Sequence, residues 1–383
     1  MAYRISLTPL VFFGAGSSSQ AGEKIKELGC EKVICITDKG VKESGVADKI
    51  VKYLREAGIK VILYDRTLPD PPDYIIEECA KIAKDEQVDG VVGVGGGSSL
   101  DTAKGVNVLL GNPLPITSYL DRSKKRLPGK TLVLIPTTAG TGSEVTSVSV
   151  ITNTKINKKG GVSGTGCIST LSLVDPELTV GLPASVTAAT GMDAFSHVAE
   201  SLTSKLANPF ADILAERAIM IIKRYLPVAV RDGSNMTART NMSLAAMLGG
   251  MTLKDAPTHI GHSIAHVLGS KLHISHGVGC AIALPEVIEH VADAVPEKVK
   301  LIGKAMGLSV DNLSTREMGR EVPEAIRRLN KDVGIPTLRE LKVEKASLES
   351  VAAEVLDDDC APFVPKETTT EKILELLHNA YKQ

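Results

Sequence analysis

The chain lacks the features that mark secreted, membrane-embedded and nucleic-acid-binding proteins. Its 383 residues include 44 Lys and Arg against 45 Asp and Glu, so a net charge of −1 provides no attraction to nucleic acid or to a membrane surface. No apolar stretch approaches the roughly 20 residues of a spanning helix, and the N-terminus has no apolar signal-peptide segment. The six cysteines are scattered without a C-x-x-C pair, which is typical of reduced core thiols. We therefore expect a cytoplasmic protein with no nucleic-acid or membrane partner.

Internal repeats, low-complexity tracts and charge blocks are also missing from the sequence, and its length suffices for two domains with full cores. Up to about residue 180, strand-like runs alternate with helical patterns, which predicts a mostly parallel sheet with helices on its faces. The strand-like runs are 32–37, 59–64, 88–94, 131–135, 147–152 and 171–174. Beyond residue 182, long helical patterns dominate. We predict an α/β domain over residues 1–181, followed by an all-α domain over residues 182–383.

Histidine is scarce but concentrated, because six of the eight histidines lie within residues 197–276. Asp193 and His197 are four residues apart in a segment that we interpret as the start of a helix, so both would lie on one helix face. His262 and His266 repeat this spacing. A lone histidine on an apolar helix face is usually only a core residue, but such clustering favours a shared site.

His276 follows ten residues after His266, and we expect Gly277 to let the chain turn sharply and direct this imidazole toward the preceding helix. The predicted metal ligands are Asp193, His197, His262 and His276. One carboxylate and three imidazoles suit Fe(II), Zn(II) or another first-row divalent ion, without the thiolates of structural zinc sites. The H-E-x-x-H pattern of zinc proteases is missing, because Ser263 stands where its general base would be. These features predict a catalytic metal site that does not belong to a protease.

A second site is indicated in the first half of the chain, where the apolar run 88–94 leads into a glycine-rich loop and then a helical pattern. The loop consists of Gly95, Gly96, Gly97 and Ser98, with Asp101 shortly after it. In this arrangement, backbone N–H groups and the helix dipole hold a phosphate. Asp38 follows an earlier apolar run, and an acid there can bond an adenosine ribose and repel a 2′-phosphate. The pattern favours NAD over NADP.

Two further loops are candidates for nucleotide contacts. The segment 14–19 follows a short strand-like run and resembles a dinucleotide fingerprint in which serine replaces the third glycine, so it is an alternative pyrophosphate site. The segment 136–146 is rich in glycine and hydroxyl groups and directly follows the run 131–135. Its Thr137, Thr138 and Thr141 would lie at the carboxyl edge of a parallel sheet, where such proteins bind ligands.

Several long motifs, in the same order, resemble those of the iron-containing (group III) alcohol dehydrogenases over about residues 5–380. These motifs are GGGS at 95–98 with Asp101 and Lys104, PTTAGTGSEVT at 136–146, DPELT at 175–179, ATGMD at 189–193 through His197, and GH at 261–262 through HG at 276–277. The resemblance implies that the four predicted ligands hold the metal and that His266 is a second active-site histidine near the substrate. The positions that it implies as NAD contacts are Asp38, Gly97, Ser98, Thr137, Thr138 and Lys159.

The resemblance implies a metal-dependent, NAD(H)-linked alcohol dehydrogenase or aldehyde reductase. It would transfer hydride between a small primary alcohol or diol and NAD in a cleft between the two domains. The metal would be Fe(II), Zn(II) or another divalent ion, and His266 is the candidate proton relay. We also expect a homo-oligomer, dimer or larger. A dehydroquinate-synthase-like lyase is an alternative, but segment 250–285 offers only Lys254 and Lys271 for a phosphorylated acid. Two more functions stay open at this point, a metal-independent reductase of the same fold and a non-catalytic binding module.

Overall fold

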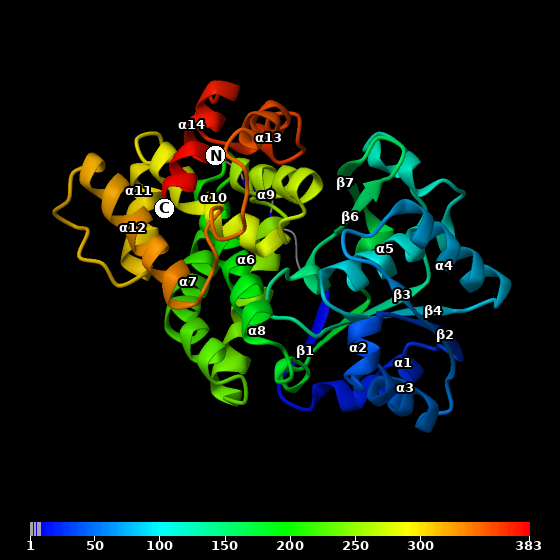
Figure 1. The fold of residues 1–383 in the computed structure, drawn as a ribbon. Coiled ribbons are helices and arrows are strands. Elements are labelled where there is room, and N and C mark those ends of the chain that lie inside the picture. Colours follow the sequence, from blue (N-terminus) through cyan, green and yellow to red (C-terminus); the bar gives the residue numbers. More distant parts are fainter. Residues whose placement is uncertain (1–2, 4, 6–8) are drawn as a thin grey trace. The chain divides into compact units, whose positions relative to one another are not determined.

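The computed structural model describes residues 3, 5 and 9–383, and these fall into two compact units. The N-terminal unit runs to Thr138 and adds Gly142–Gly181, whereas the helical unit contains Ala139–Thr141 and Leu182–Gln383. All strands of the described residues belong to the N-terminal unit (Figure 1). The predicted fold class, a parallel-sheet unit followed by a helical unit, is confirmed.

The N-terminal unit is built on a six-stranded parallel sheet with the strand order β1-β8-β5-β4-β2-β3. The strands are β1 Leu10–Phe13, β2 Lys32–Asp38, β3 Lys60–Thr67, β4 Gly90–Gly95, β5 Thr131–Pro136 and β8 Leu171–Val174. Every residue of the central strand β4 is buried, as expected where both faces of a sheet are covered. Because all these strands run the same way, the loops after β2, β4 and β5 emerge at one edge of the sheet.

Helices cover both faces of this sheet. They are α1 Ala21–Glu27, α2 Lys39–Glu43, α3 Val46–Glu56, α4 Asp73–Asp85 and α5 Gly97–Gly111. Helices α1 and α3 bury Ile25 and Ile50 in the core on one face, and α4 and α5 bury Ile76 and Leu100 in the core on the other. The two pairs lie on opposite sides of the sheet in Figure 1. Apolar side chains therefore hold the sheet between two helical layers, which fixes its carboxyl edge.

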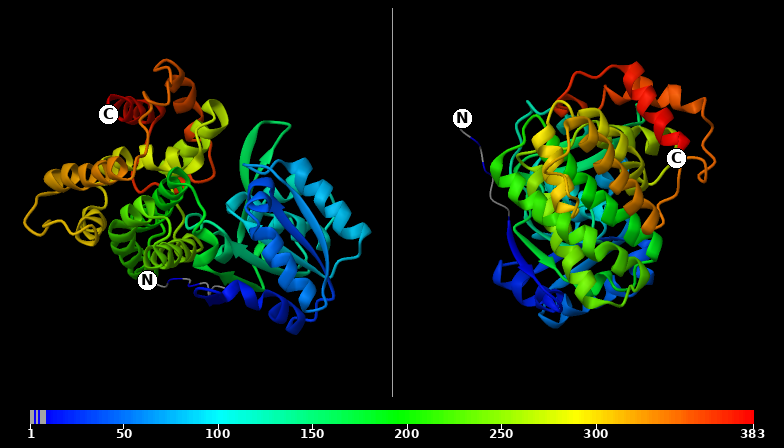
Figure 2. Two further views of the ribbon diagram at one scale, coloured as in Figure 1. Left: turned by 60° about the horizontal axis from the view of Figure 1, so that its bottom comes forward. Right: turned by 90° about the vertical axis from the view of Figure 1, so that its left-hand side faces the viewer.

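The prediction that residues 147–152 form a strand of the main sheet is wrong. Strand β6 (Val148–Asn153) pairs antiparallel with β7 (Lys158–Ser163) in a separate two-stranded sheet, visible as a hairpin in Figure 2. Only residues 154–157 connect the two strands. A connection this short produces an antiparallel hairpin, because a parallel pair needs a crossover of about a dozen residues or more.

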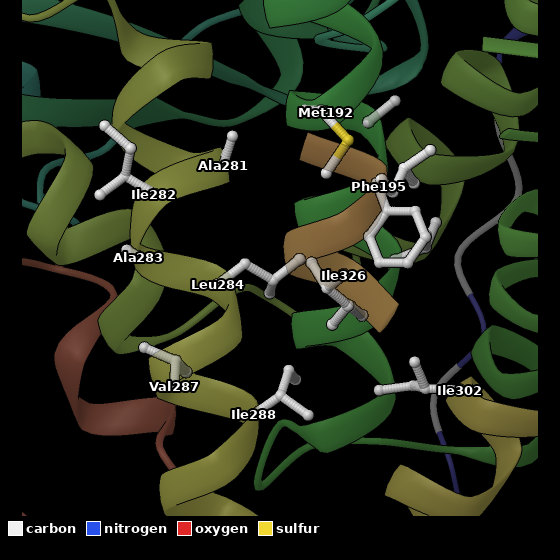
Figure 3. Close-up of a cluster of buried hydrophobic side chains, with 14 of the residues drawn as sticks. Met192, Phe195, Ala281, Ile282, Ala283, Leu284, Val287, Ile288, Ile302 and Ile326 are labelled. Atoms are coloured by element: carbon white, nitrogen blue, oxygen red, sulfur yellow. The ribbon is translucent and has the colours of Figure 1, made fainter. Parts of the chain in front are cut away.

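The helical unit contains long helices around one apolar core. These are α6 Ala184–Thr203, α7 Pro209–Arg231, α8 Met236–Leu253, α9 Ile260–Leu272, α10 His276–Val291, α11 Pro296–Ala305, α12 Thr315–Asp332, α13 Ser347–Val355 and α14 Thr370–Lys382. Figure 3 shows Met192 and Phe195 of α6 in this core, with Leu284 of α10, Ile302 of α11 and Ile326 of α12. No helix among the described residues has both the length and the apolar character that a membrane crossing requires.

The prediction that residues 191–197 begin a helix is wrong in its position. Helix α6 already starts at Ala184, directly after Pro183 at the N-cap position. Proline favours such a helix start because its φ angle is preset and no backbone N–H is lost. Asp193 and His197 consequently lie in the middle of a long helix, where they still share one face because both belong to the same regular element.

Candidate functional site

The four predicted metal ligands meet around one carboxylate oxygen of the helical unit. Asp193 and His197 come from α6, His262 comes from α9, and His276 is the first residue of α10. Asp193 Oδ1 lies 3.8, 3.7 and 3.4 Å from the Nε2 atoms of His197, His262 and His276, respectively. Two tetrahedral ligands, each about 2.1 Å from one ion, are separated by roughly 3.4 Å. The spacing of these donor atoms fits a shared divalent cation.

The donor atoms are also left unsatisfied by the protein itself. Asp193 is 2% exposed and His262 is 4% exposed, and neither Asp193 Oδ1 nor His262 Nε2 has a hydrogen-bond partner among the described residues. A buried polar atom without a partner costs about 1–3 kcal/mol. Burial lowers the pKa of His197 to about 4, so this imidazole is neutral and keeps a lone pair for a metal. The geometry therefore suits a cation, and His197 can coordinate it without first losing a proton.

The local structure at His276 differs from the sequence-based prediction. We expected Gly277 to make a sharp turn, but it lies inside α10, which begins at His276 itself. A Cβ atom on Gly277 would come 2.2 Å from the carbonyl oxygen of Ala189, so glycine is needed because α10 approaches the backbone of α6 closely. The turn occurs earlier, at His273, whose φ angle of 56° lies in the left-handed region.

Glu200 contacts His262 on the side of the ring that faces away from Asp193, and sequence reasoning missed this residue. Its Oε1 lies 2.6 Å from His262 Nδ1, and its Oε2 accepts hydrogen bonds from the backbone N–H groups of His259 and Gly261 at 2.8 and 3.0 Å. Burial alone would raise the pKa of Glu200, but the neighbouring His262 and His259 and these hydrogen bonds hold it at about 2. The signal was present, because Glu200 follows Asp193 by seven residues and shares its helix face.

His266 is held beside the cluster by a residue from a distant part of the chain. Its Nδ1 lies 2.9 Å from Asp358 Oδ2, while Asp358 Oδ1 accepts from Ser263 Oγ at 2.9 Å and from the backbone N–H of Cys360 at 3.0 Å. The His266 ring stacks on that of His276 with centroids 5.2 Å apart. Sequence reasoning missed Asp358, since nothing in its local pattern indicates a partner 92 residues away.

In the N-terminal unit, the glycine loop joins β4 directly to α5. Gly95 has a φ angle of 151°, and a Cβ atom there would lie 2.6 Å from the Ser99 side chain. Gly96 takes the N-cap position without a side-chain cap, and α5 begins at Gly97, so Gly97 and Ser98 form its first turn. The first backbone N–H groups of a helix lack intrahelical partners. The loop therefore has the local form of a phosphate-binding site.

Asp38, Thr137 and Thr138 lie next to this loop. Asp38 Oδ2 accepts a hydrogen bond from Ser99 Oγ at 3.0 Å, and its Oδ1 caps α2 by accepting from the Val41 N–H at 3.0 Å. Thr137 donates its backbone N–H to the carbonyl of Gly95 at 2.9 Å. A Cβ atom on Gly96 would meet the side chain of Thr138 at 3.4 Å. Neighbouring strands thus bring these predicted cofactor contacts together at one edge of the sheet.

The other predicted cofactor residues are Asp101, Lys159 and Thr141. The Asp101 carboxylate faces inward, where it accepts from Ser143 Oγ at 2.7 Å and from the Val150 N–H at 3.1 Å. Lys159 belongs to β7, and its Nζ lies 2.6 Å from Asp70 Oδ1. Thr141 belongs to the short segment Ala139–Thr141, which groups with the helical unit. Asp101 and Lys159 therefore already have polar partners within the protein.

The alternative phosphate loop at residues 14–19 is already filled by a side chain of the protein. The backbone N–H groups of Gly16 and Ser18 donate to the Asp175 carboxylate at 3.0 and 3.1 Å, and Ser18 Oγ donates to it at 2.6 Å. These donors would face a pyrophosphate in a dinucleotide fingerprint. An internal carboxylate therefore already accepts from the donors of this loop.

Comparisons with known proteins agree along the length of the chain. A family model described as "Iron-containing alcohol dehydrogenase" matches residues 8–176, and one described as "Fe-containing alcohol dehydrogenase family, C-terminal" matches residues 187–381. The 1,3-propanediol dehydrogenase of Citrobacter freundii is 39% identical over 387 residues, which cover 100% of each chain.

Solved structures are similar over the same extent. A crystal structure of a 1,3-propanediol oxidoreductase has a TM-score of 0.95 and 37% identity, covering 99% of this chain and 100% of that one. A sulfoacetaldehyde reductase from Bifidobacterium kashiwanohense, solved in complex with NAD+, has a TM-score of 0.90 and 27% identity, with 100% of both chains covered.

Proposed function

The chain belongs to the iron-containing alcohol dehydrogenase family, and from that premise we propose that it is an NAD-linked enzyme acting on a small primary alcohol or diol. The family resemblance that the motifs predicted is confirmed, and with it the class of enzyme, an alcohol dehydrogenase. In the reverse direction the same enzyme would reduce the corresponding aldehyde. The observation that carries the proposal is the convergence of three imidazole Nε2 atoms on Asp193 Oδ1.

The metal would be Fe(II), or else Zn(II) or another divalent ion, held by Asp193, His197, His262 and His276. When bound, such a cation polarises the oxygen of an alcohol or aldehyde and stabilises the negative charge that develops there. The carboxylate of Asp193 contributes the one formal charge of this set. Glu200 would hold His262 by accepting from its Nδ1–H, so that Nε2, which faces Asp193, is the nitrogen available to the metal.

NAD would bind with its pyrophosphate at residues 95–98, where the first N–H groups of α5 have no intrahelical partner. NAD accepts or returns the hydride. Asp38 would bond the adenosine ribose from the neighbouring strand, and Thr137 and Thr138 would line the same edge of the sheet. We propose Thr141 and Lys159 as cofactor contacts on the basis of the family motifs alone. Asp101 would stabilise the loop that follows β5, because it accepts a hydrogen bond from Ser143 in that loop. NAD+ in a similar structure supports this choice of cofactor.

His266 would carry the substrate's proton. Its Nδ1 is engaged by Asp358, so the other ring nitrogen, Nε2, takes or returns the proton of the substrate hydroxyl. The stacking contact with His276 places this ring beside the metal ligands. We further propose that the enzyme acts in the cytoplasm as a homo-oligomer, dimer or larger. All six cysteines are free, which supports a reducing compartment.

Metal depletion tests this proposal. Chelation should abolish alcohol oxidation while leaving NAD binding and most secondary structure in place, and Fe(II) should restore the rate. His276→Ala should behave like the depleted enzyme, because it removes one of four ligands. His290→Ala is the matched control, since His290 lies further along α10 and pairs with Thr368. Full turnover by verified metal-free protein would contradict the proposal and favour a metal-independent reductase.

A further inference from the structure

We propose that Cys280 is an additional ligand of the metal centre, which makes it a mixed nitrogen, oxygen and sulfur site. This inference rests on the proposed function, because it presupposes that the centre binds a metal. Cys280 follows His276 by four residues on α10, so both side chains point to the same side of that helix. The cluster thereby gains a donor whose chemistry differs from that of the four predicted ligands.

The distances around the Cys280 sulfur fit coordination. Cys280 Sγ lies 3.7 Å from His276 Nε2. If an ion holds sulfur at 2.3 Å and nitrogen at 2.1 Å with an angle of about 109° between the two bonds, the two ligand atoms lie roughly 3.6 Å apart. One donor atom from each of Asp193, His262, His276 and Cys280 lies within 4.8 Å of the others. The sulfur therefore meets the same spacing as three of the four predicted ligands.

An independent observation marks the same point as a ligand position. Asp193 Oδ1 and His262 Nε2 are both buried and lack hydrogen-bond partners among the residues that the structure describes. Cys280 is 1% exposed, so no bulk solvent separates its sulfur from these atoms. A cation placed among them would satisfy the oxygen, the nitrogen and the sulfur together.

Cys360 does not meet the same conditions, although it lies near His266 and Asp358. The Asp358 carboxylate already accepts hydrogen bonds from Ser263, His266 and the Cys360 backbone. Both carboxylate oxygens of Asp358 therefore have hydrogen-bond partners, so this group gives no indication of a bound cation. Cys360 is thus a suitable control, because it is a second cysteine close to the active-site histidines that we do not expect to bind metal.

Coordination of Cys280 has two chemical consequences. The thiol must lose its proton to solvent when the metal–sulfur bond forms, so metal uptake releases one proton more than the oxygen and nitrogen ligands alone would release. Thiolate is also a soft ligand, which favours Zn(II) and Co(II) over Mg(II) and Mn(II) more strongly than carboxylate and imidazole alone.

Cobalt substitution of the full-length protein tests the ligand role without measuring turnover. Bound Co(II) gives visible ligand-field bands with any donor set, whereas a thiolate ligand adds a near-ultraviolet charge-transfer band. We expect both features in the wild type. Cys280→Ser should keep the visible bands and lose the near-ultraviolet band, and Cys360→Ser should keep both.

The outcomes separate this inference from the proposed function. Visible bands without a charge-transfer band in the wild type, or survival of that band in Cys280→Ser, would overturn the role of Cys280 alone. Failure of the wild type to bind cobalt would overturn the metal centre itself. X-ray absorption of the zinc-loaded wild type requires no variant: one sulfur scatterer at about 2.3 Å is expected, and a shell of only nitrogen and oxygen would reject the inference.

Discussion

Glu200 Oε1 and His262 Nδ1 lie 2.6 Å apart, both buried, and this contact fixes the orientation of the His262 ring. The pKa of Glu200 is held at about 2, so its carboxylate is ionised at neutral pH and can only accept this hydrogen bond. His262 must then donate from Nδ1, which leaves Nε2, the atom that faces Asp193, as the nitrogen available to a metal. One carboxylate outside the ligand set thus decides which nitrogen of a proposed ligand is available.

The first prediction concerns this pair. Glu200→Gln should raise the dissociation constant for the metal by roughly 10- to 100-fold, as is usual when a partner behind a ligating histidine is removed. A titration against a competing chelator measures the change. Glu289→Gln alters an exposed acid on α10 that contacts Arg327 and should leave metal affinity unchanged. Equal affinities for wild type and Glu200→Gln would show that Glu200 does not orient His262.

The second prediction concerns the choice of cofactor. Asp38→Asn removes the charge that opposes a 2′-phosphate but retains a side-chain oxygen that can cap α2, as Asp38 Oδ1 does. A like-charge contact is worth several kcal/mol, so the ratio of kcat/KM for NADP to that for NAD should rise at least roughly tenfold. Asp38→Gly should change the ratio similarly and lose slightly more stability. An unchanged ratio in both variants would remove Asp38 from the adenosine site.

The third prediction concerns the proton relay. His266→Gln should lower kcat by roughly 100-fold or more near neutral pH while the protein retains its metal, because general acid–base groups typically contribute that much. Asp358→Asn should lower kcat less, since it weakens only the orientation of the His266 ring. Metal content and kcat are measured on the same samples. Loss of metal from His266→Gln would instead identify His266 as a ligand or a direct support of one.

The fourth prediction concerns the pH dependence of stability. Burial raises the pKa of Glu144 from 4.5 to about 7 in the folded protein, so the folded state binds this proton more tightly than the unfolded state. The resulting stabilisation is fully present below about pH 4.5 and is lost as the pH rises through about 7. The difference of about 2.5 pKa units corresponds to roughly 3 kcal/mol.

Urea unfolding of wild type and Glu144→Gln checks this effect. The variant keeps a neutral side chain at every pH, so its free energy of unfolding relative to wild type should be about 2–3 kcal/mol more favourable at about pH 8 than at about pH 5. Groups that titrate elsewhere cancel in this comparison. The same difference at both pH values would show that Glu144 does not carry a raised pKa.

Short-range spacing made part of the site predictable. Asp193 and His197 lie four residues apart, and the residues 95–98 directly link β4 to α5, so regular local geometry alone places these groups. Glu200 was within reach of the same reasoning, since it occupies the next turns of the same helix face. Local spacing failed at His276, because the close approach of α10 to Ala189, and not a turn, explains Gly277.

The sequence by itself determined the family, the order of a parallel-sheet unit and a helical unit, and the residue types of the proposed metal and phosphate sites, because periodicity and ordered motifs are local properties of the chain. Only the tertiary structure decided that Asp175 fills the first glycine loop, that Asp358 engages His266, and that β6 and β7 form a separate hairpin. The carboxylate contacts join residues 157 and 92 positions apart. Such pairings depend on how helices and strands pack, which no local pattern records.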